Sequence, residues 1–511
     1  MQGTTLKPLR KKREVIKTPG RTTIRFANPR RSLVTPMNRF YANDNWAYVP
    51  EVWAQEGVRI LYEEMLFAAT VHRDFNSEIA SFGETVHTRK PAEFTAKRKQ
   101  NDLDDLEDQD ATSTDIEVVL NQRVYTSFLL GDSERTKSFQ DLVPIYLLPA
   151  MRSNARLLDQ ALAGQVYQFM ANRAGGLGSM SKTNSHDYML DTRKVLNDNK
   201  VPSDSRWFAW ASGSETTLQK TEMFKKADEI GDAGRALREA YIGRLAGFNN
   251  FLELNVPSIS GATTATGSAT AAIVPAGSTS FDVTSSHGSN FAVGDWITIA
   301  GDMTPQQVTA ISTDTLTISP GTLNAAAASA TVTRYAPKLV DQASAIAAGD
   351  KTAAVTDGYP SGWMKEIHID SAGAVTPQVG QLVTFATAGT PNVILAGKYC
   401  ITQVTNTASN DYDILLDRPL ETAITDNDVV NLGPDGDYNF AYRRNALALV
   451  NRPLILPDSG TGVRAGVGMD NNMSLRVSMS YDSLKQATRI TVDGLFGVKV
   501  LDTDQGAVCY G

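Results

Sequence analysis

The segment of residues 149–173, PAMRSNARLLDQALAGQVYQFMANR, constrains the fold of this chain more than any other stretch. Apolar residues recur in it at steps of three and four, the spacing that lines up side chains along one face of an α-helix. The residues on this face are Met151, Ala155, Leu158, Leu162, Val166 and Phe169. The segment therefore predicts an amphipathic helix about 35–40 Å long, which needs a large surface to pack on.

The predicted helix has a signal at each end. Pro149 suits a first helical turn, and Gly175, Gly176 and Gly178 follow the last periodic residue as a stop signal. The periodicity by itself fits a core helix of a globular enzyme equally well, so other features must decide the class of protein.

The composition excludes several classes of function. With 511 residues and a formal net charge of −7, the chain has no general attraction to nucleic acid or to acidic membranes. Cys400 and Cys509 are too few for a disulfide framework or a cysteine-rich metal site. The basic N-terminus is not followed by an apolar segment, and eighteen apolar residues never run together. We therefore expect synthesis in a reducing cytoplasm, no export and no membrane partner.

The N-terminal 45 residues are strongly basic and rich in proline. Their cations are Lys7, Arg10, Lys11, Lys12, Arg13, Lys17, Arg21, Arg25, Arg30 and Arg31. Such a segment buries too little apolar surface to order itself, so it predicts either an arm that folds onto a partner or a disordered tail. Arg10, Lys11, Lys12 and Arg13 are its candidate contact residues.

Residues 84–122 contain a basic run followed by an acidic run. The basic limb contains Arg89, Lys90, Lys97, Arg98 and Lys99, and the acidic tip contains Asp102, Asp104, Asp105, Glu107, Asp108 and Asp110. Extended, β-like runs flank them on both sides. The pattern predicts a long hairpin that projects over a neighbouring molecule, with these charges as candidate contacts, or else a solvated charged loop.

The remaining chain has core-like sequence on both sides of a charge-poor stretch. Before it, we predict a helix from Pro50, strands at 206–212 and 248–255, and helices at 214–226 and 236–246. Residues 258–437 are rich in Ala, Ser, Thr and Gly, typical of all-β modules, and core-like sequence resumes at 438–511. A folded insertion with adjacent ends costs little closure entropy. FAVGDWITIAG at 291 and PQVGQLVTFATAG at 377 are similar, which indicates two modules or the two halves of one enlarged domain. Identical turn chemistry can also produce such a likeness by chance.

The sequence has almost no motif that is typical of catalysis or of cofactor binding. The histidines at 72, 87, 186, 287 and 368 have no metal-ligand spacing, so we interpret them as structural or surface residues. Ser133 has no later Asp-x-x-His partner for a hydrolase mechanism. The glycines at 175–178 follow a helix and fail as a phosphate loop, and Asp435-Gly436-Asp437 fits a turn better than a calcium loop. We expect no enzyme activity, no cofactor and no metal.

Several segments, in order, resemble one known family. They are residues 45–99, KSFQDLVPIYLLPAM at 137–151, ALREAYIGRLAGFNNFLELNVP at 236–257, and 441–508 from AYRRNALALVNRPLILP to TVDGLFGVKVLDTDQGAV. These resemble the coat proteins of short-tailed phages of the P-twenty-two type, which are members of the Hong Kong 97-type capsid fold.

The resemblance implies an α+β fold and assigns a role to each predicted part. Residues 1–45 correspond to the N-terminal arm, about 84–122 to the extended E-loop, about 149–173 to the spine helix, and 258–437 to an inserted all-β domain. Residues 46–257 and 438–511 would form the two parts of the capsid core. The insert is larger than usual in the family, which leaves the role of its second half open.

The function that the resemblance implies is that of a major capsid protein of a tailed double-stranded DNA phage. It would be made in the host cytoplasm and reside in the virion, as hexamers and pentamers of an icosahedral shell. Scaffolding protein and portal would be further partners, and enclosed DNA would be contacted non-specifically at most. We expect the arm to contact a neighbouring coat surface rather than DNA. The alternative is an exported adhesin or fibre built from β-modules, which would require an export signal.

Overall fold

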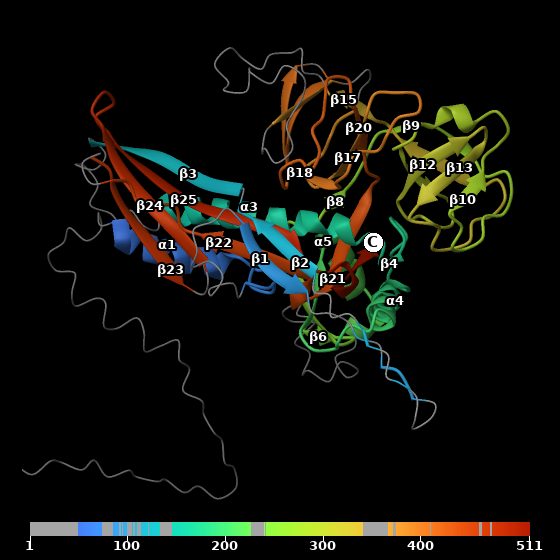
Figure 1. The fold of residues 1–511 in the computed structure, drawn as a ribbon, viewed down its shortest axis with the longest axis horizontal. Coiled ribbons are helices and arrows are strands. Elements are labelled where there is room, and N and C mark those ends of the chain that lie inside the picture. Colours follow the sequence, from blue (N-terminus) through green and yellow to red (C-terminus); the bar gives the residue numbers. More distant parts are fainter. Residues whose placement is uncertain are drawn as a thin grey trace, which may run out of the picture. The chain divides into compact units, whose positions relative to one another are not determined.

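The computed structural model is dominated by strands, with few helices (Figure 1). It describes residues 50–73, 85–90, 94, 96–99, 105, 108–109, 114–120, 122–132, 146–225, 240, 242–340, 366–370, 375–408, 410–458, 462–470 and 473–511. These residues all belong to one compact unit, which spans residues 47–511. The predicted N-terminal arm lies outside the described residues.

The helix predicted over residues 149–173 is present but shorter than expected. Helix α3 spans Leu148–Gly164, with Pro149 in its first turn, and is therefore about 26 Å long. A 3-10 turn, η5 (Gln165–Phe169), follows, and residues Arg173–Gly175 form strand β4. The expectation of one helix to residue 173 capped by glycines was thus wrong. Beyond η5 the backbone pairs in parallel with strand β26 (Gly506–Tyr510), which satisfies its polar groups in a sheet instead.

The apolar face of this helical segment is buried as predicted. All six residues of the predicted stripe have at most 3% of their surface exposed. They pack in the largest core cluster with helix α1 (Pro50–Glu64), which begins at the predicted proline. Trp53, Val58 and Leu61 are the buried residues of α1 in that cluster.

Helix α1 lies on a sheet of long antiparallel strands. The sheet contains β3 (Gln122–Gly131), β22 (Leu447–Arg452), β23 (Arg464–Asp470), β24 (Met473–Asp482) and β25 (Ala487–Val500). In β24, Leu475, Val477 and Met479 are buried as the alternating sequence predicted, while Tyr481 is exposed. β3 pairs with β25 over ten residues, so the end of the hairpin segment is part of this sheet.

A second sheet runs through the core. Its order is β4-β26-β21-β5-β7-β6, with β21 (Gly436–Arg443), β5 (Arg206–Trp210), β7 (Phe248–Leu252) and β6 (Arg244–Leu245), and β8 (Ser258–Ile259) pairs with β21 beside it. Strands β5 and β7 confirm two predicted strands. Helices α4 (Ser185–Asp198), α5 (Ser212–Gln219) and α6 (Glu222–Lys225) adjoin them, and the last two confirm the helical prediction for 214–226 with a break between them.

The prediction of a helix over 236–246 was wrong where the structure describes it. Residues Arg244–Leu245 form β6, which turns back through Gly247 to pair antiparallel with β7. Gly243 and Gly247 both have positive φ, at 64° and 87°, a conformation that favours tight turns over a helix. The turns at these two glycines therefore prevent the helix that the apolar periodicity of the segment predicted.

Residues 258–437 contain two β-modules. The first has strands β9 (Thr264–Ala269), β10 (Ser280–Asp282), β11 (Trp296–Ile299), β12 (Gln306–Ser312), β13 (Thr315–Ser319) and β14 (Thr331–Tyr335). The second has β15 (Lys338–Val340), β16 (Ile367–Asp370), β17 (Leu382–Ala386), β18 (Tyr399–Ala408), β19 (Asp411–Leu416) and β20 (Val429–Leu432). Each module has its own apolar cluster.

The two modules share one strand order. The first runs β10-β13-β12-β11-β14-β9, and the second runs β16-β19-β18-β17-β20-β15 and closes into a barrel. Counting strands from the start of each module, the two orders are identical. The similar sequence segments fall on equivalent strands, β11 and β17, and each follows a glycine of positive φ, Gly294 and Gly380. The sequence repeat is therefore a structural repeat of two modules.

Helix α1 approaches its sheet so closely that it requires glycine in β23. A Cβ atom built on Gly468 would overlap the backbone carbonyl of Ala54, which a side-chain movement cannot relieve. Gly494 in β25 is different, because its Cβ would meet its nearest neighbours at an ordinary 3.5 Å.

We expect Gly468→Ala to lower the free energy of unfolding by about 1–3 kcal/mol, since α1 must shift off the sheet. Urea unfolding followed by tryptophan fluorescence measures the change, because Trp53 lies in α1. Gly494→Ala is the matched control and should change stability far less. Equal effects of the two substitutions would contradict the close approach as the cause.

Candidate functional site

The predicted hairpin has a firmly packed base. Strands β1 (Thr85–Lys90) and β2 (Thr114–Val119) pair antiparallel in the register Thr85↔Val119. Buried Val86, Val118 and Leu120 form an apolar cluster with Ala448 and Val450 of β22. The end of the hairpin that joins the core is therefore fixed by burial.

The connecting part of the hairpin is exposed wherever the structure describes it. Residues 94, 96–99, 105, 108 and 109 are all exposed, and Phe94 has 63% of its surface accessible. Of the predicted contact residues, Lys97, Arg98, Lys99, Asp105 and Asp108 lie there, while Arg89 and Lys90 belong to β1. Arg10, Lys11, Lys12, Arg13, Asp102, Asp104 and Glu107 lie outside the described residues. Charge pairing between subunits through the basic limb and the acidic tip stays a prediction.

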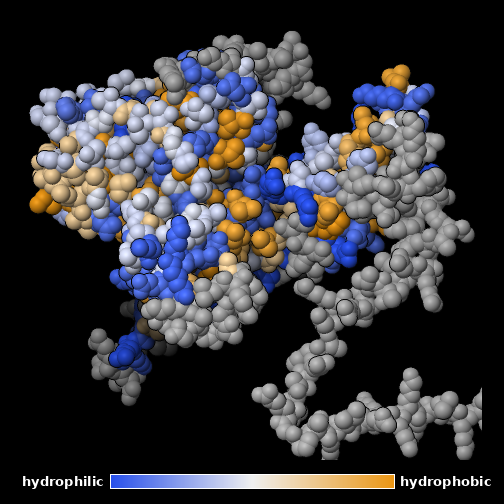
Figure 2. Space-filling model, turned by 180° about the vertical axis from the view of Figure 1, so that it is seen from behind, coloured by the Kyte–Doolittle hydropathy of each residue, from blue (hydrophilic) through white to orange (hydrophobic). Residues whose placement is uncertain are grey.

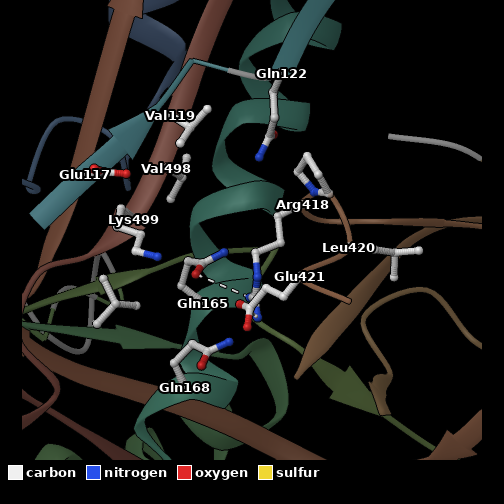
Figure 3. Close-up of a pocket in the computed structure, with 12 residues that line it drawn as sticks. Glu117, Val119, Gln122, Gln165, Gln168, Arg418, Leu420, Glu421, Val498 and Lys499 are labelled. Atoms are coloured by element: carbon white, nitrogen blue, oxygen red, sulfur yellow. Dashed lines mark hydrogen bonds and ion pairs between the residues drawn. The ribbon is translucent and has the colours of Figure 1, made fainter. Parts of the chain in front are cut away.

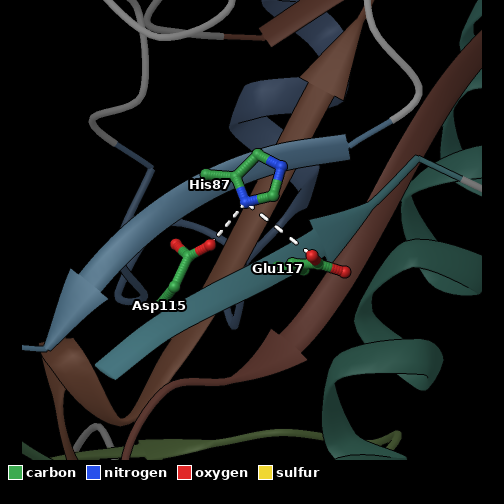
Figure 4. Close-up of side chains that lie close together, drawn as sticks. All are labelled: His87, Asp115 and Glu117. Carbon is green, nitrogen blue, oxygen red and sulfur yellow. Dashed lines mark hydrogen bonds and ion pairs between the residues drawn. The ribbon is translucent and has the colours of Figure 1, made fainter. Parts of the chain in front are cut away.

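Three polar side chains gather on one face of the hairpin (Figure 4). His87 lies opposite Glu117, and Asp115 is two residues along the same strand, so all three share a face. The His87 Nδ1 atom is 2.8 Å from a carboxylate oxygen of Asp115 and 3.9 Å from one of Glu117. Among the described residues these are the side chains that could hold a metal ion, although exposed acidic groups are common without one.

The end of α3 meets the second β-module through buried polar groups. Gln165 donates its amide to the Asp417 carboxylate at 2.9 Å, and Asp417 also accepts the backbone N–H of Cys400 at 2.8 Å. Burial raises the pKa of Asp417, which the positive charge of Arg418 opposes. A Cβ on Gly164 would lie 2.8 Å from the Cys400 Cβ, so the module and helix are in direct backbone-level contact. Sequence analysis missed this junction, because nothing in the local pattern pairs positions so far apart.

A cavity of about 200 Å³ opens beside this junction (Figure 3). Its walls come from the hairpin base, β3, η5, β25 and the loop after β19. The lining residues are Glu117, Val119, Gln122, Gln165, Gln168, Arg418, Pro419, Leu420, Glu421, Val498, Lys499 and Val500. Figure 3 shows Gln165, Arg418 and Glu421 converging at its centre. Arg418 is held there by Glu421 at 3.2 Å and Asp417 at 3.6 Å.

The remaining chemically reactive groups have structural surroundings. Burial raises the pKa of the Cys509 thiol to about 12 and raises that of Cys400, so neither is a thiolate at neutral pH. Asp435 and Asp437, considered above for calcium, accept hydrogen bonds from backbone N–H groups of residues 261 and 262 and from Ser214 and Ser258. Ser133 lies outside the described residues. Within the described part of the chain, no helix is long and apolar enough to cross a membrane.

Asp159 of α3 is a buried carboxyl with a strongly raised pKa. It accepts the backbone N–H groups of Leu66 and Ala68 at 3.2 and 3.1 Å, just past the end of α1. Burial raises its pKa to about 8, and the nearby charge of Glu253 adds to the rise. The two helices are thus joined through a carboxyl group that is protonated at neutral pH.

This raised pKa predicts a pH dependence of stability. The unfolded chain releases the Asp159 proton near pH 4 and the folded chain near pH 8, so its stabilising contribution is complete below pH 4 and is lost between pH 4 and 8. We expect the unfolding free energy to fall by up to about 1.4 kcal/mol per pH unit over this window. In urea titrations at pH 5 and 8, Asp159→Asn should reduce the fall, whereas Asp187→Asn on the exposed face of α4 should not. An unchanged slope in Asp159→Asn would contradict the assignment.

Comparisons with known proteins return distant structural likenesses alone. No family model matches the chain, and no curated protein matches it. A solved structure titled "Mycobacterium phage Che8" is 13% identical, covers 87% of this chain and 90% of its own, and has a TM-score of 0.40. "Capsid structure of the Cyanophage P-SCSP1u" is 10% identical, covers 84% of both chains, and has a TM-score of 0.39. "Asymmetric unit of bacteriophage PhiM1 mature capsid" is 10% identical, covers 87% of this chain and 86% of its own, and has a TM-score of 0.36. All three titles name a phage and two name a capsid, but TM-scores below 0.5 leave the function to be argued from the chain's own residues.

Proposed function

We propose that this chain is a major capsid protein of a tailed double-stranded DNA phage, which assembles into an icosahedral shell around the genome. The observation that carries the proposal is the hairpin of β1 and β2. Its base is buried against β22, while every described residue of its charged connecting part is exposed. A hairpin whose base is fixed by burial and whose described charged residues are exposed offers a surface suited to another copy of the protein.

The domain division follows from the same proposal. Residues 46–257 and 438–511 would be the capsid core of the Hong Kong 97-like type, and 258–437 the inserted domain, made of two β-modules. The resemblance of the core segments to phage coat proteins supports this assignment. In it, α3 is the spine helix and residues 84–122 are the E-loop.

The exposed charges of the hairpin fit the weak contacts by which subunits of a shell associate. Exposed ion pairs contribute about 0–1 kcal/mol each, so no single one could hold subunits together. Apolar burial must supply most of the association energy, and the face seen in Figure 2 carries several separate hydrophobic patches among polar residues. Many weak, repeated contacts let misplaced subunits leave before the shell closes. The charged limbs would chiefly set the register between copies.

The other partners follow from this role. A scaffolding protein and a portal would take part in assembly, and the enclosed DNA would meet the shell without sequence-specific contacts. The basic arm would lie against a neighbouring coat surface, and the protein would reside in the virion after synthesis in the host cytoplasm. No catalytic step is part of the proposal.

We expect the purified protein to form closed particles of uniform size, alone or with its scaffolding partner. Sedimentation velocity and negative-stain electron microscopy measure the outcome directly. A protein that remains monomeric at high concentration under both conditions would speak against a coat role.

A charge-reversal variant tests the hairpin. Replacing Lys97, Arg98 and Lys99 with Glu should lower the yield of particles and change its salt dependence, because the limb would repel its acidic partner. The melting temperature of the unassembled subunit should change little, since these residues are exposed. Reversing the exposed Lys182, Lys194 and Lys220 is the matched control. Normal yield and salt response in the first variant would remove the role of charge.

A further inference from the structure

Strand β3 lies at one edge of the sheet that carries α1 (Figure 1). It pairs with β25 over residues 122–131, and no described residue pairs with its other side. In an antiparallel strand the N–H and C=O groups of alternate residues point to opposite sides. About half of the residues of β3 therefore present backbone groups along this edge to another extended chain.

The edge lacks the features by which proteins usually prevent pairing, which are charges, prolines and β-bulges. Residues 124–130, VYTSFLL, contain no charge, no Pro and no Gly, and their register with β25 has no bulge. Uncharged, β-rich segments of this length associate readily. The strand at the opposite edge, β23, differs because it begins at Arg464, ends at Asp470 and contains two glycines. The unguarded edge of β3 therefore indicates a strand that is used for pairing.

The exposed face of β3 carries two large apolar side chains. Tyr125 and Leu129 are 67% and 41% exposed, and the exposed Ser127 lies between them on the same face. The other face is turned towards α3, where Thr126 donates its hydroxyl to Asn154 at 2.6 Å. The exposed face thus presents an apolar, a polar and an apolar residue in a row centred on Ser127.

This row matches itself about a two-fold axis through Ser127. In antiparallel pairing centred there, Tyr125 of one copy lies opposite Leu129 of the other, and the same pair recurs on the far side of the axis. Large apolar residues directly opposite each other bury surface between the strands. No like charges meet in this register, because Arg123 faces the uncharged Gly131. The strand is therefore complementary to a second copy of itself.

We propose that β3 of one copy pairs antiparallel with β3 of a second copy about this axis, so that one sheet continues across two subunits. The choice of partner rests on the proposed shell function, in which each subunit has other copies as neighbours. The basic N-terminal segment suits the edge less well, because its prolines at 8, 19, 29 and 36 cannot donate to a strand ladder. The contact is isologous, since both subunits use the same surface.

A cysteine at the axis tests the pairing directly. Ser127→Cys would place two thiols opposite each other, where the Cα atoms of an antiparallel pair lie about 4.5–5.5 Å apart, within reach of a disulfide. The two native cysteines are buried and do not compete. Oxidation of assembled particles should convert subunits to covalent dimers on a non-reducing gel. No larger species should form, because one thiol at a two-fold axis links two copies.

The matched control lies on the same face of the same strand. Leu129→Cys is also exposed, but the register keeps its two copies four residues apart, about 13 Å along the strands, so it should give no dimer. Tyr125→Cys combined with Leu129→Cys brings opposite positions together and should restore the dimer. Particles that give no dimer with Ser127→Cys, as expected if another protein or the N-terminal segment occupies the edge, would overturn the proposal. Equal dimer from Leu129→Cys alone would overturn it too.

A charge at the axis gives a second measurement that needs no cross-link. Ser127→Lys would oppose two positive charges and should raise the subunit concentration needed for assembly about tenfold or more. Ser483→Lys, in the turn between β24 and β25, is the control and should leave that concentration unchanged. Neither variant should alter the melting of the unassembled subunit, since both serines are exposed.

The two measurements separate the strand pairing from the shell function. If the parent protein assembles and Ser127→Lys assembles equally well, the pairing is wrong while the shell function stands. If the parent forms no particles but Ser127→Cys still yields dimers, the shell function is wrong and the pairing stands. If neither particles nor dimers form, both are wrong.

Discussion

Helix α3 is the constraint on which the other parts depend, because its buried polar residues bond neighbouring elements while its apolar face packs in the core. Asn154 accepts a hydrogen bond from Thr126 of β3, Asp159 holds the turn after α1, and Gln165, just beyond the helix, binds Asp417 in the second β-module. All three are buried. Each polar group thus fixes one neighbouring element by a bond that is costly to leave unmade. The helix therefore contributes to the apolar core, and its segment also forms the hydrogen bonds that hold β3, the turn after α1 and the second β-module.

This double use explains what the sequence could and could not predict. The apolar stripe and the helix start at Pro149 follow local rules, and both appear as expected. The helix end does not follow such rules, because the segment beyond η5 pairs with β26, which lies more than 300 positions away in the sequence. Likewise the buried Asp159 and Gln165 look like surface residues in a helical pattern. Only the tertiary partner distinguishes a buried polar residue from a solvated one.

The hairpin was likewise only partly predictable from the sequence. The extended, β-like runs on both sides of the charged residues predicted its strands, and Val86 and Val118 are buried at its base. The charge separation of its limbs indicated a surface for a neighbour, but the cavity between β2, η5 and the loop after β19 involves four separate regions of the sequence. No spacing rule brings such regions together. The wrong prediction of a helix at Arg244, which lies in a strand, has a different cause. Gly243 and Gly247 stand in this segment and both adopt positive φ, so they could have been weighed more heavily against a helix.

The two β-modules share a strand order and differ in their attachments. The first contacts the segment after η5, where Leu177 donates its backbone N–H to Met303, whereas the second is bonded to Gln165 through Asp417. Trp296 of the first module also donates its indole N–H to Thr384 of the second. One strand order therefore serves two different attachments to the rest of the chain. Because each module is held by its own bonds, loss of either module would remove a distinct link to the core.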